Sequence, residues 1–184
     1  MGRMRKSVIG LIVFVVVVAA GIIVYEVMQP PTVGTFVFQV SDQPNAISDF
    51  DNLIVNISKV SVHSASDNLE NSWQNFTPTT SSVDLVTIQG DNVQTLISTT
   101  LAVGMYTQVR LVVTSASGIL KAGGTVSVTV PSGELKLVQS FQISAGETTT
   151  FLLDLNVVRE GAGYILSPVA GKIFSGIEYV QGND

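Results

Sequence analysis

The 184-residue chain contains no cysteine and a single histidine, His63. Without cysteine, disulfide bonds, thiolate catalysis and zinc–sulfur sites are excluded. One histidine leaves only one possible base for a Ser-His-Asp triad, and it excludes metal sites built from several histidines. The folded part of the chain must therefore be held together by its apolar core.

Positive charge is scarce after the first six residues. Residues 26–184 carry all 14 acidic residues but only six of the nine basic ones, which gives this segment a net charge of −8. An acidic, moderately charged surface argues against binding to nucleic acid or to an anionic lipid surface. The segment has about 155 residues, enough for one domain with a sizeable core.

An uncharged apolar run, VIGLIVFVVVVAAGIIV, occupies residues 8–24. At helical rise this run spans roughly 26 Å, close to the thickness of the hydrocarbon layer, and a segment that crosses this layer must be helical. Arg3, Arg5 and Lys6 precede the run, and cations beside a span stay in the cytoplasm. The sequence therefore predicts a single-pass protein of the cell membrane. Its parts would be a cytoplasmic N-terminus (1–7), a transmembrane signal anchor (8–28), a Pro-Pro linker (29–33) and an extracytoplasmic domain (34–184).

Two other interpretations of the N-terminus stay open. Val18-Ala19-Ala20 is a passable cleavage site, so a signal peptide could be removed there. The apolar run continues through Val24, longer than the usual core of a signal peptide, and this favours a retained anchor. A pilin-type leader is favoured least. Lys6-Ser7 lacks the Gly or Ala that is usual before such a run, and Pro30-Pro31 ends the helix just beyond the membrane.

The rest of the chain alternates apolar and polar residues, and turn residues separate the alternating segments. Strands are expected at residues 34–40, 53–62, 73–76, 83–88, 105–113, 126–130, 135–143, 148–156, 164–174 and 177–180. The alternation shifts phase near Ser58-Lys59, which predicts a β-bulge, and residues 90–99 allow one helical turn. The pattern predicts an all-β domain, an antiparallel β-sandwich of the immunoglobulin or prealbumin type, with a barrel as the alternative.

Several short motifs follow one another in a recognisable order. They are SDQP at 41–44, LIVNISKVSVH at 53–63, Trp73, VDL at 83–85, LAVGMY at 101–106, VRL at 109–111, PSG at 131–133, LKL at 135–137, LDL at 153–155 and YILSPV at 164–169. Over roughly residues 34–174 this order resembles the archaeal and bacterial extracytoplasmic family called domain of unknown function four-three-eight-two. The resemblance implies an envelope location and a β-sandwich, and it implies no activity. Ser167 replaces the lysine of the family's usual Leu-Lys-Pro, so no role of that lysine is carried over.

Three acidic residues, Asp42, Asp49 and Asp51, gather around the first loop, with Asn45 and Asn52 beside them. Calcium takes several oxygen ligands from loops of this kind, so the three carboxylates are weak candidates for a calcium site. The favoured interpretation is a solvated loop of Asx turns, and the spacing is not that of an EF-hand. We therefore expect no bound metal and no cofactor.

Three charged residues stand inside otherwise apolar strands: Asp84, Arg110 and Asp154. A buried charge needs a partner. We expect a structural ion pair between Arg110 and one of the two carboxylates, in preference to a carboxylate that binds a ligand.

The remaining candidates are single polar or aromatic residues. His63 is expected to be a polar residue at a strand end, because no Gly-x-Ser-x-Gly elbow accompanies it. Trp73 and Tyr106 could stack on a carbohydrate, although a lone Trp in a sandwich is more often part of the core. Asn56 and Asn75 begin N-glycosylation sequons.

These features favour a membrane-anchored, non-catalytic extracytoplasmic module that has a surface-binding or structural role or serves as an accessory subunit of a membrane assembly. The alternative is a secreted filament subunit, assembled by β-strand complementation after leader cleavage. A hydrolase is not expected, since no catalytic residues can be assembled. The expected partners are the lipid bilayer, through residues 8–28, and an envelope protein or glycan, but not nucleic acid.

Overall fold

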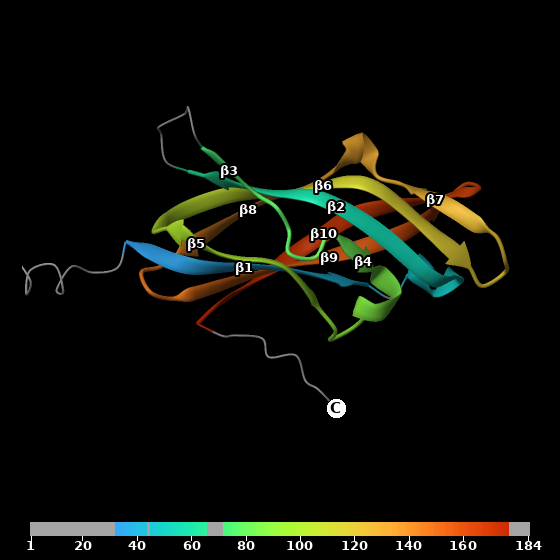
Figure 1. Ribbon diagram of the computed structural model, residues 1–184, viewed down its shortest axis with the longest axis horizontal. Helices are drawn as coiled ribbons and strands as arrows, with labels where there is room; N and C mark the ends of the chain where they lie inside the picture. The colour runs from blue at the N-terminus through green and yellow to red at the C-terminus, as the bar shows by residue number, and fades with distance from the viewer. Residues whose placement is uncertain (1–31, 44, 66–71, 177–184) are drawn as a thin grey trace, which may run out of the picture. The chain divides into compact units, whose positions relative to one another are not determined.

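The computed structural model describes residues 32–43, 45–65 and 72–176 (Figure 1). The chain divides into two compact units, residues 1–31 and 32–184, and all described residues belong to the second unit. The predicted transmembrane helix, most of the linker and the strand expected at 177–180 lie outside the described residues. Within the described part, no helix is long and apolar enough to cross a membrane.

The described residues form strands and short 3-10 helices but no α-helix, so the all-β prediction is confirmed. The strands are β1 (Val33–Asp42), β2 (Phe50–Ser64), β3 (Trp73–Phe76), β4 (Ser82–Asp84), β5 (Gln94–Ala102), β6 (Gly104–Leu120), β7 (Thr125–Thr129), β8 (Glu134–Ile143), β9 (Thr148–Glu160) and β10 (Gly163–Ser175). The 3-10 helices are η1 (Ala46–Asp49), η3 (Leu85–Ile88) and η4 (Pro131–Gly133).

Hydrogen bonds join the strands into one nearly closed sheet in the order β3-β2-β6-β7-β10-β9-β1-β5, with β4 beside β2 and β8 beside β6. Most neighbours are antiparallel, but β1 runs parallel to β9 and β10 runs parallel to β7. The expectation of a purely antiparallel domain therefore needs correction. Thr35 pairs with Thr148, so β1 starts beside the turn that leads into β9, and both strands leave that end in the same direction.

Aromatic rings form the centre of the core in the half of the sheet where β1 starts. Phe141 stacks on Phe36 with 5.2 Å between ring centroids and on Tyr106 at 5.4 Å, and it meets Phe151 edge-on at 5.4 Å. All four rings are at most 3% exposed. Burial of each large apolar side chain contributes about 1.5–3 kcal/mol, so this cluster is a main source of stability.

Two local predictions are confirmed. The register of β2 against β6 shifts between Ile57 and Lys59, which is the β-bulge expected from the phase of the sequence. The short strand expected at residues 73–76 is β3.

The helical turn allowed within residues 90–99 is wrong, because most of this segment belongs to β5. Leu96 and Ile97 are both buried, and β5 completes the hydrogen bonding of one edge of β1. Pairing with β1 therefore outweighs the local helical spacing.

The strand expected at residues 83–88 is also wrong beyond Asp84, because β4 ends there and the chain turns into the 3-10 helix η3. Asp84 Oδ1 caps η3 by accepting a hydrogen bond from the Val86 backbone N–H at 3.1 Å.

The strands run between two ends of the molecule. The near end holds the start of β1, the turn from β5 to β6 and the turn from β8 to β9. The far end holds η1 and the turns that follow β6 and β9. In Figure 1 the near end is on the left, where β1 begins, and the far end is on the right, beyond the label of β7. β6 connects the two ends and has a contour length of about 50 Å.

Candidate functional site

The far end contains a small hollow, which we call the far-end pocket. Its volume is about 200 Å³, and it is lined by Ser48, Asp49, Leu120, Lys121, Ala122, Arg159 and Tyr164. The lining comes from η1, from the β6–β7 turn and from the strands that flank the β9–β10 turn. Three segments distant in the sequence therefore meet around one hollow, which is lined by both acidic and basic side chains.

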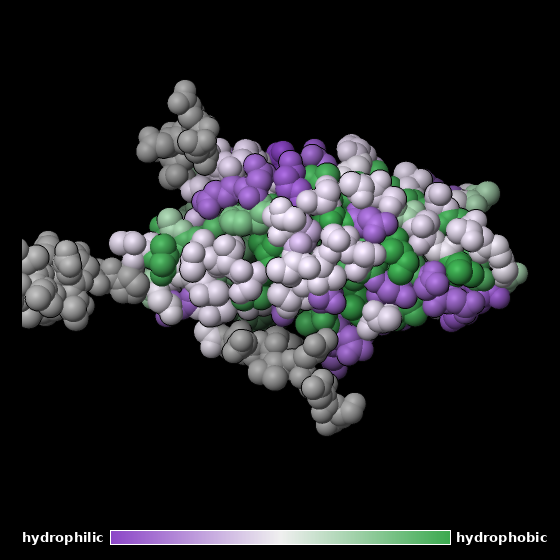
Figure 2. All heavy atoms as spheres, in the orientation of Figure 1, coloured by the Kyte–Doolittle hydropathy of each residue, from purple (hydrophilic) through white to green (hydrophobic). Residues whose placement is uncertain are grey.

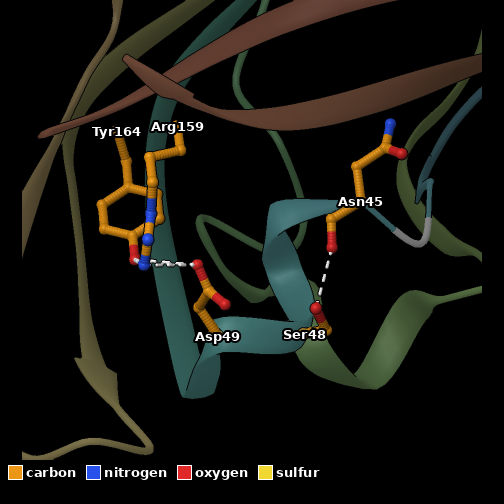
Figure 3. Close-up of polar contacts among 5 residues, drawn as sticks. All are labelled: Asn45, Ser48, Asp49, Arg159 and Tyr164. Atoms are coloured by element: carbon orange, nitrogen blue, oxygen red, sulfur yellow. Dashed lines mark hydrogen bonds and ion pairs between the residues drawn. The ribbon is translucent and has the colours of Figure 1, made fainter. Parts of the chain in front are cut away.

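Asp49, Arg159 and Tyr164 form a closed triangle of hydrogen bonds beside this pocket (Figure 3). Arg159 Nη2 donates to Asp49 Oδ2 at 3.0 Å and to the Tyr164 hydroxyl at 2.9 Å. The Tyr164 hydroxyl in turn donates to Asp49 Oδ2 at 2.9 Å. The triangle ties η1 to the β9–β10 hairpin, and it fixes the direction in which the guanidinium points.

Local structure explains these positions. Arg159 and Tyr164 are direct partners across the β9–β10 ladder, so their side chains stand side by side. The Tyr164 ring is 5% exposed and meets Phe50 edge-on at 4.7 Å, which leaves mainly its hydroxyl at the surface. Asp49 is the last residue of η1, where the Ser48 hydroxyl donates to the Asn45 carbonyl at 3.0 Å (Figure 3).

The electrostatics of the far-end pocket favour binding. The hydrogen bond to Tyr164, supported by the charge of Asp49, raises the pKa of Arg159. An arginine is charged at every physiological pH, and these contacts favour the charged form further. Lys121 adds a second cation to the lining, against the single carboxylate of Asp49. A planar guanidinium, an ammonium and a hydroxyl suit carboxylate groups or the hydroxyl groups of a sugar. Ser48 does not form a nucleophile–base pair, because its hydroxyl donates to a backbone carbonyl.

The near end has a larger hollow, which we call the near-end pocket. Its volume is about 510 Å³. The described residues that line it are uncharged: Ser64, Ala65, Gln74, Ala102, Val103, Gly104, Met105 and Tyr106. Burial raises the pKa of the Tyr106 hydroxyl, although a hydrogen bond with Gln74 acts in the opposite direction. The same hydroxyl lies 3.1 Å from the carbonyl of Ala102, to which it donates.

The structure separates the three acidic residues considered as calcium ligands. Asp49 is held by Arg159 and Tyr164, and Asp51 is exposed at the start of β2. Asp42 is 2% exposed, and neither of its carboxylate oxygens has a hydrogen-bond partner. Burial, together with the nearby charge of Asp154, raises the pKa of Asp42 to about 7. Over residues 32–43, 45–65 and 72–176, no group of three or more His, Asp or Glu side chains could hold a metal ion.

The structure also does not bring Asp84, Arg110 and Asp154 together. Asp84 caps η3 and accepts a second hydrogen bond from the Leu53 backbone N–H at 3.0 Å. The Arg110 guanidinium carbon lies 3.9 Å from the centroid of the Trp73 ring, in a cation–π contact.

Asp154 has partners of its own on the face of the sheet where it lies. The Ser41 hydroxyl donates to it, and Lys172 Nζ lies 3.3 Å from its Oδ2. The expected pairing with Arg110 needs correction, because β7 and β10 separate β9 from β6 in the sheet.

The aromatic candidates do not form a pair. Trp73 packs edge-on against His63 at 4.7 Å and lies partly exposed on the edge strand β3, whereas Tyr106 is 2% exposed inside the core. His63 lies near the end of β2, where its Nδ1 is 2.8 Å from the Thr107 hydroxyl.

The two sequon asparagines occupy different surroundings. Asn75 is exposed on β3, where its side-chain oxygen accepts from the Ser61 hydroxyl at 2.7 Å. Asn56 pairs with β4 on one side and β6 on the other, and its side chain donates to the Ser115 hydroxyl at 2.9 Å. Use of either sequon stays a prediction, with Asn75 in the more accessible place.

Sequence reasoning found Asp49 but missed Lys121, Arg159 and Tyr164. Asp49 and Arg159 are 110 residues apart, and only the folded sheet brings them together. The available signal was local: Arg159 and Tyr164 flank the Gly161 turn, where cross-strand partners are expected.

Comparison with known proteins gives one family and one remote structural similarity. A family model described as "Domain of unknown function (DUF4382)" matches residues 33–168. A crystal structure of a protein from Bacteroides eggerthii DSM 20697, provisionally named a cell adhesion protein, is similar with a TM-score of 0.31 and 6% identity. The similarity covers 79% of this chain and 55% of that one, so this chain spans little more than half the length of the other. A comparison with curated proteins finds no match.

Proposed function

The chain belongs to the DUF4382 family, and from this premise we propose that it is a membrane-anchored, extracytoplasmic module that binds a partner without catalysis. Its domain would be a sandwich of the immunoglobulin or prealbumin kind, in which β1, β5, β9 and β10 form one layer and β2, β6 and β8 form the other. The predicted anchor over residues 8–28 would hold it in the cell membrane. The partner would be an envelope protein or a glycan.

One observation carries this proposal: the chain enters the domain at one end, and the charged pocket lies at the other. β1 begins at Val33 in the near end, only a few residues after the predicted span. Arg159 and Lys121 lie at the far end, beyond the full length of β6. In a domain tethered at the near end, the far-end pocket lies at the end of the domain opposite the attachment point.

The exposed groups of the far-end pocket suit recognition. The Arg159 side chain is 63% exposed even though two hydrogen bonds orient it. An oriented, exposed guanidinium binds carboxylates and sugar hydroxyls with little loss of side-chain entropy. An accessory role in a membrane assembly fits the same arrangement, since a protein partner would present carboxylates.

The absence of cysteine allows a direct test of topology. In the full chain, Lys121→Cys should react in intact cells with a maleimide that cannot cross membranes. The matched control, Ser7→Cys, should react only after the cells are permeabilised. Protection of the K121C thiol until lysis would contradict the extracytoplasmic location.

The same variant tests the binding site. A photo-crosslinker attached to K121C in native membranes should give one adduct of defined mass, and an additional Arg159→Gln substitution should reduce its yield several-fold. The control is Val138→Cys, because Val138 is 79% exposed on β8 outside the far-end pocket. Equal yields of the same adduct from K121C and V138C would show that the far-end pocket is not the binding site.

The filament alternative has no specific support from the described residues. β1 is hydrogen-bonded on both sides inside its own domain, to β5 and to β9. A donated strand would have to come from residues 21–28. Recovery of the native protein as detergent-free polymers that begin near Gly21 would favour the filament over the anchor.

A further inference from the structure

We propose that the near end is a membrane-contacting surface, at which Val33, Val103 and Met105 insert into the headgroup region of the bilayer. We call these three residues the apolar tip. This inference rests on the anchoring proposed above and goes beyond it, since an anchored domain could equally stand clear of the lipid. The occupant of this surface would be the lipid bilayer that holds the anchor.

The side chains of the apolar tip are exposed at the end where the chain enters the domain. They are 43%, 44% and 46% exposed for Val33, Val103 and Met105, respectively. Figure 2 shows hydrophobic atoms at this end, around the start of β1. Exposed apolar side chains that lie together can mark a contact with a partner or a membrane. The far end also exposes Ile119 and Val158, at 44% and 43%, so the position of the tether, and not exposure alone, favours the near end.

Backbone hydrogen bonds hold the apolar tip in place. The Val103 N–H donates to the Thr32 carbonyl at 2.9 Å, so the β5–β6 turn lies against the start of β1. The Gly146 N–H donates to the Val33 carbonyl at 2.9 Å, and the Ala65 N–H donates to the Met105 carbonyl at 2.8 Å. The tip is therefore fixed before any contact, and little conformational entropy is lost when it inserts.

Charge is sparse among the described residues around the apolar tip. The described lining residues of the adjacent near-end pocket are uncharged. Glu147 is exposed on the neighbouring β8–β9 turn, where its carbonyl accepts from the Thr35 N–H at 2.8 Å. In the sequence, Asp67 and Glu70 also follow closely after Ala65. Acidic neighbours suit a zwitterionic interface better than an anionic one.

The tether is short enough to keep the near end close to the bilayer. Four residues, 29–32, separate the predicted span from β1, and fully extended they would reach about 14 Å. The headgroup region on each side of a bilayer is about 5–7 Å thick. The near end of an anchored domain therefore stays within reach of the interface. The apolar tip then meets lipid at a high effective concentration, without a diffusional search.

A second copy of the chain is a less suitable occupant. Three partly exposed side chains fall far below the ~800 Å² per partner that a stable protein interface buries. Shallow insertion into a bilayer has no such requirement, because each apolar side chain transfers independently.

The experiment uses fluorescence quenching to compare how close a fluorophore comes to the lipid when it is attached at the near end or at the far end of the domain. Full-length Val103→Cys and Ile119→Cys variants carry the same fluorophore, in phosphatidylcholine vesicles that contain lipids spin-labelled near the headgroup. Ile119 is the matched control, because it is also 44% exposed but lies at the far end. We expect at least threefold stronger quenching of the V103C label, and Met105→Cys should repeat the result if V103C does not fold.

Flotation of the vesicles separates failure of this inference from failure of the anchor. If the protein floats with the vesicles and the V103C and I119C labels are quenched equally, the membrane-contacting surface is wrong and the anchor stands. If the protein does not float with the vesicles, both the anchor and this inference are wrong.

Discussion

The two ends of the domain are stabilised in different ways. The near end is packed by stacked rings, with Phe141 between Phe36 and Tyr106, and the described lining residues of its pocket are uncharged. The far end is held by hydrogen bonds among Asp49, Arg159 and Tyr164, and it contains both cations of the far-end pocket.

This difference has a physical consequence. Ring packing depends little on salt or pH, whereas charged hydrogen bonds weaken as ionic strength rises, and a buried carboxyl responds to pH. We expect the near end to behave as a constant support and the far end to respond to its surroundings. Such a division suits a domain that is attached at one end and recognises a partner with the other.

The largest effect should come from the ring cluster of the near end. Phe141→Ala removes a ring that is 3% exposed and contacts three other rings, so the full chain in mild detergent should lose about 3–5 kcal/mol of unfolding free energy. Urea denaturation followed by circular dichroism measures this loss, which should not change with salt. The exposed far-end control, Ile119→Ala, should cost about 0.5 kcal/mol. A loss below about 1 kcal/mol for Phe141→Ala would contradict the proposed role of the rings.

A second prediction concerns the buried carboxyl of Asp42 at the far end of β1. Its pKa is raised to about 7, so the folded chain binds the proton more tightly than the unfolded chain. Stability should therefore fall as pH rises from about 4 to 7 and then stay level above 7. Asp42→Asn removes this loss. The free energy of unfolding of the variant should match that of the native chain at pH 4 and exceed it by about 2 kcal/mol at pH 8. This difference is about half of what the pKa shift alone would give, because a buried site relaxes when it ionises.

Urea unfolding of the full chain at a series of pH values measures the Asp42 effect. Asp51→Asn is the control, since Asp51 is exposed on the adjacent strand and its substitution should leave the pH profile unchanged. Parallel pH profiles for the native chain and Asp42→Asn would show that Asp42 does not ionise in this range.

Period-two alternation was sufficient to predict most of the fold. It predicted the bulge between Ile57 and Lys59, because a bulge changes which side chains face the core. Residues 73–76 form β3 as expected, although none of the β3 side chains is buried. Alternation could not predict that β1 lies between β5 and β9, with β9 parallel to it. Strand order depends on contacts far apart in sequence, and alternation contains no information about them.

The candidate site was harder to predict for the same reason. Asp49 was visible as part of an acidic loop, but the loop suggested calcium, whereas the folded chain gives Asp49 an arginine and a tyrosine as partners. The charged residues inside the strands were expected to pair with one another, yet Arg110 lies against Trp73 and Asp154 lies beside Lys172. The buried Arg110 Nε has no hydrogen-bond partner among the described residues. The sequence shows which charged side chains stand inside apolar strands. Which side chains lie next to them depends on the order of the strands in the sheet.

The smallest and sharpest test compares one tyrosine hydroxyl at each end. Tyr164 is 5% exposed and donates to the Asp49 carboxylate, while Tyr106 is 2% exposed and donates to the neutral carbonyl of Ala102. Each tyrosine→phenylalanine substitution removes one hydroxyl and leaves the ring. At low salt we expect a loss of about 1.5 kcal/mol for Tyr164→Phe and about 1 kcal/mol for Tyr106→Phe, since a bond to a charged acceptor is the stronger one.

Salt then distinguishes the two hydroxyls. In 1 M NaCl the Debye length falls to about 3 Å, so the loss for Tyr164→Phe should shrink by about half and the loss for Tyr106→Phe should stay the same. Because the substitution is identical at both ends, general effects of salt on unfolding cancel when each variant is compared with the native chain. The measurement is the urea midpoint of the full chain in detergent at the two salt concentrations. Equal salt dependence of the two variants would mean that charged interactions stabilise the far end no more than the near end. The proposed contrast between the two ends would then be wrong.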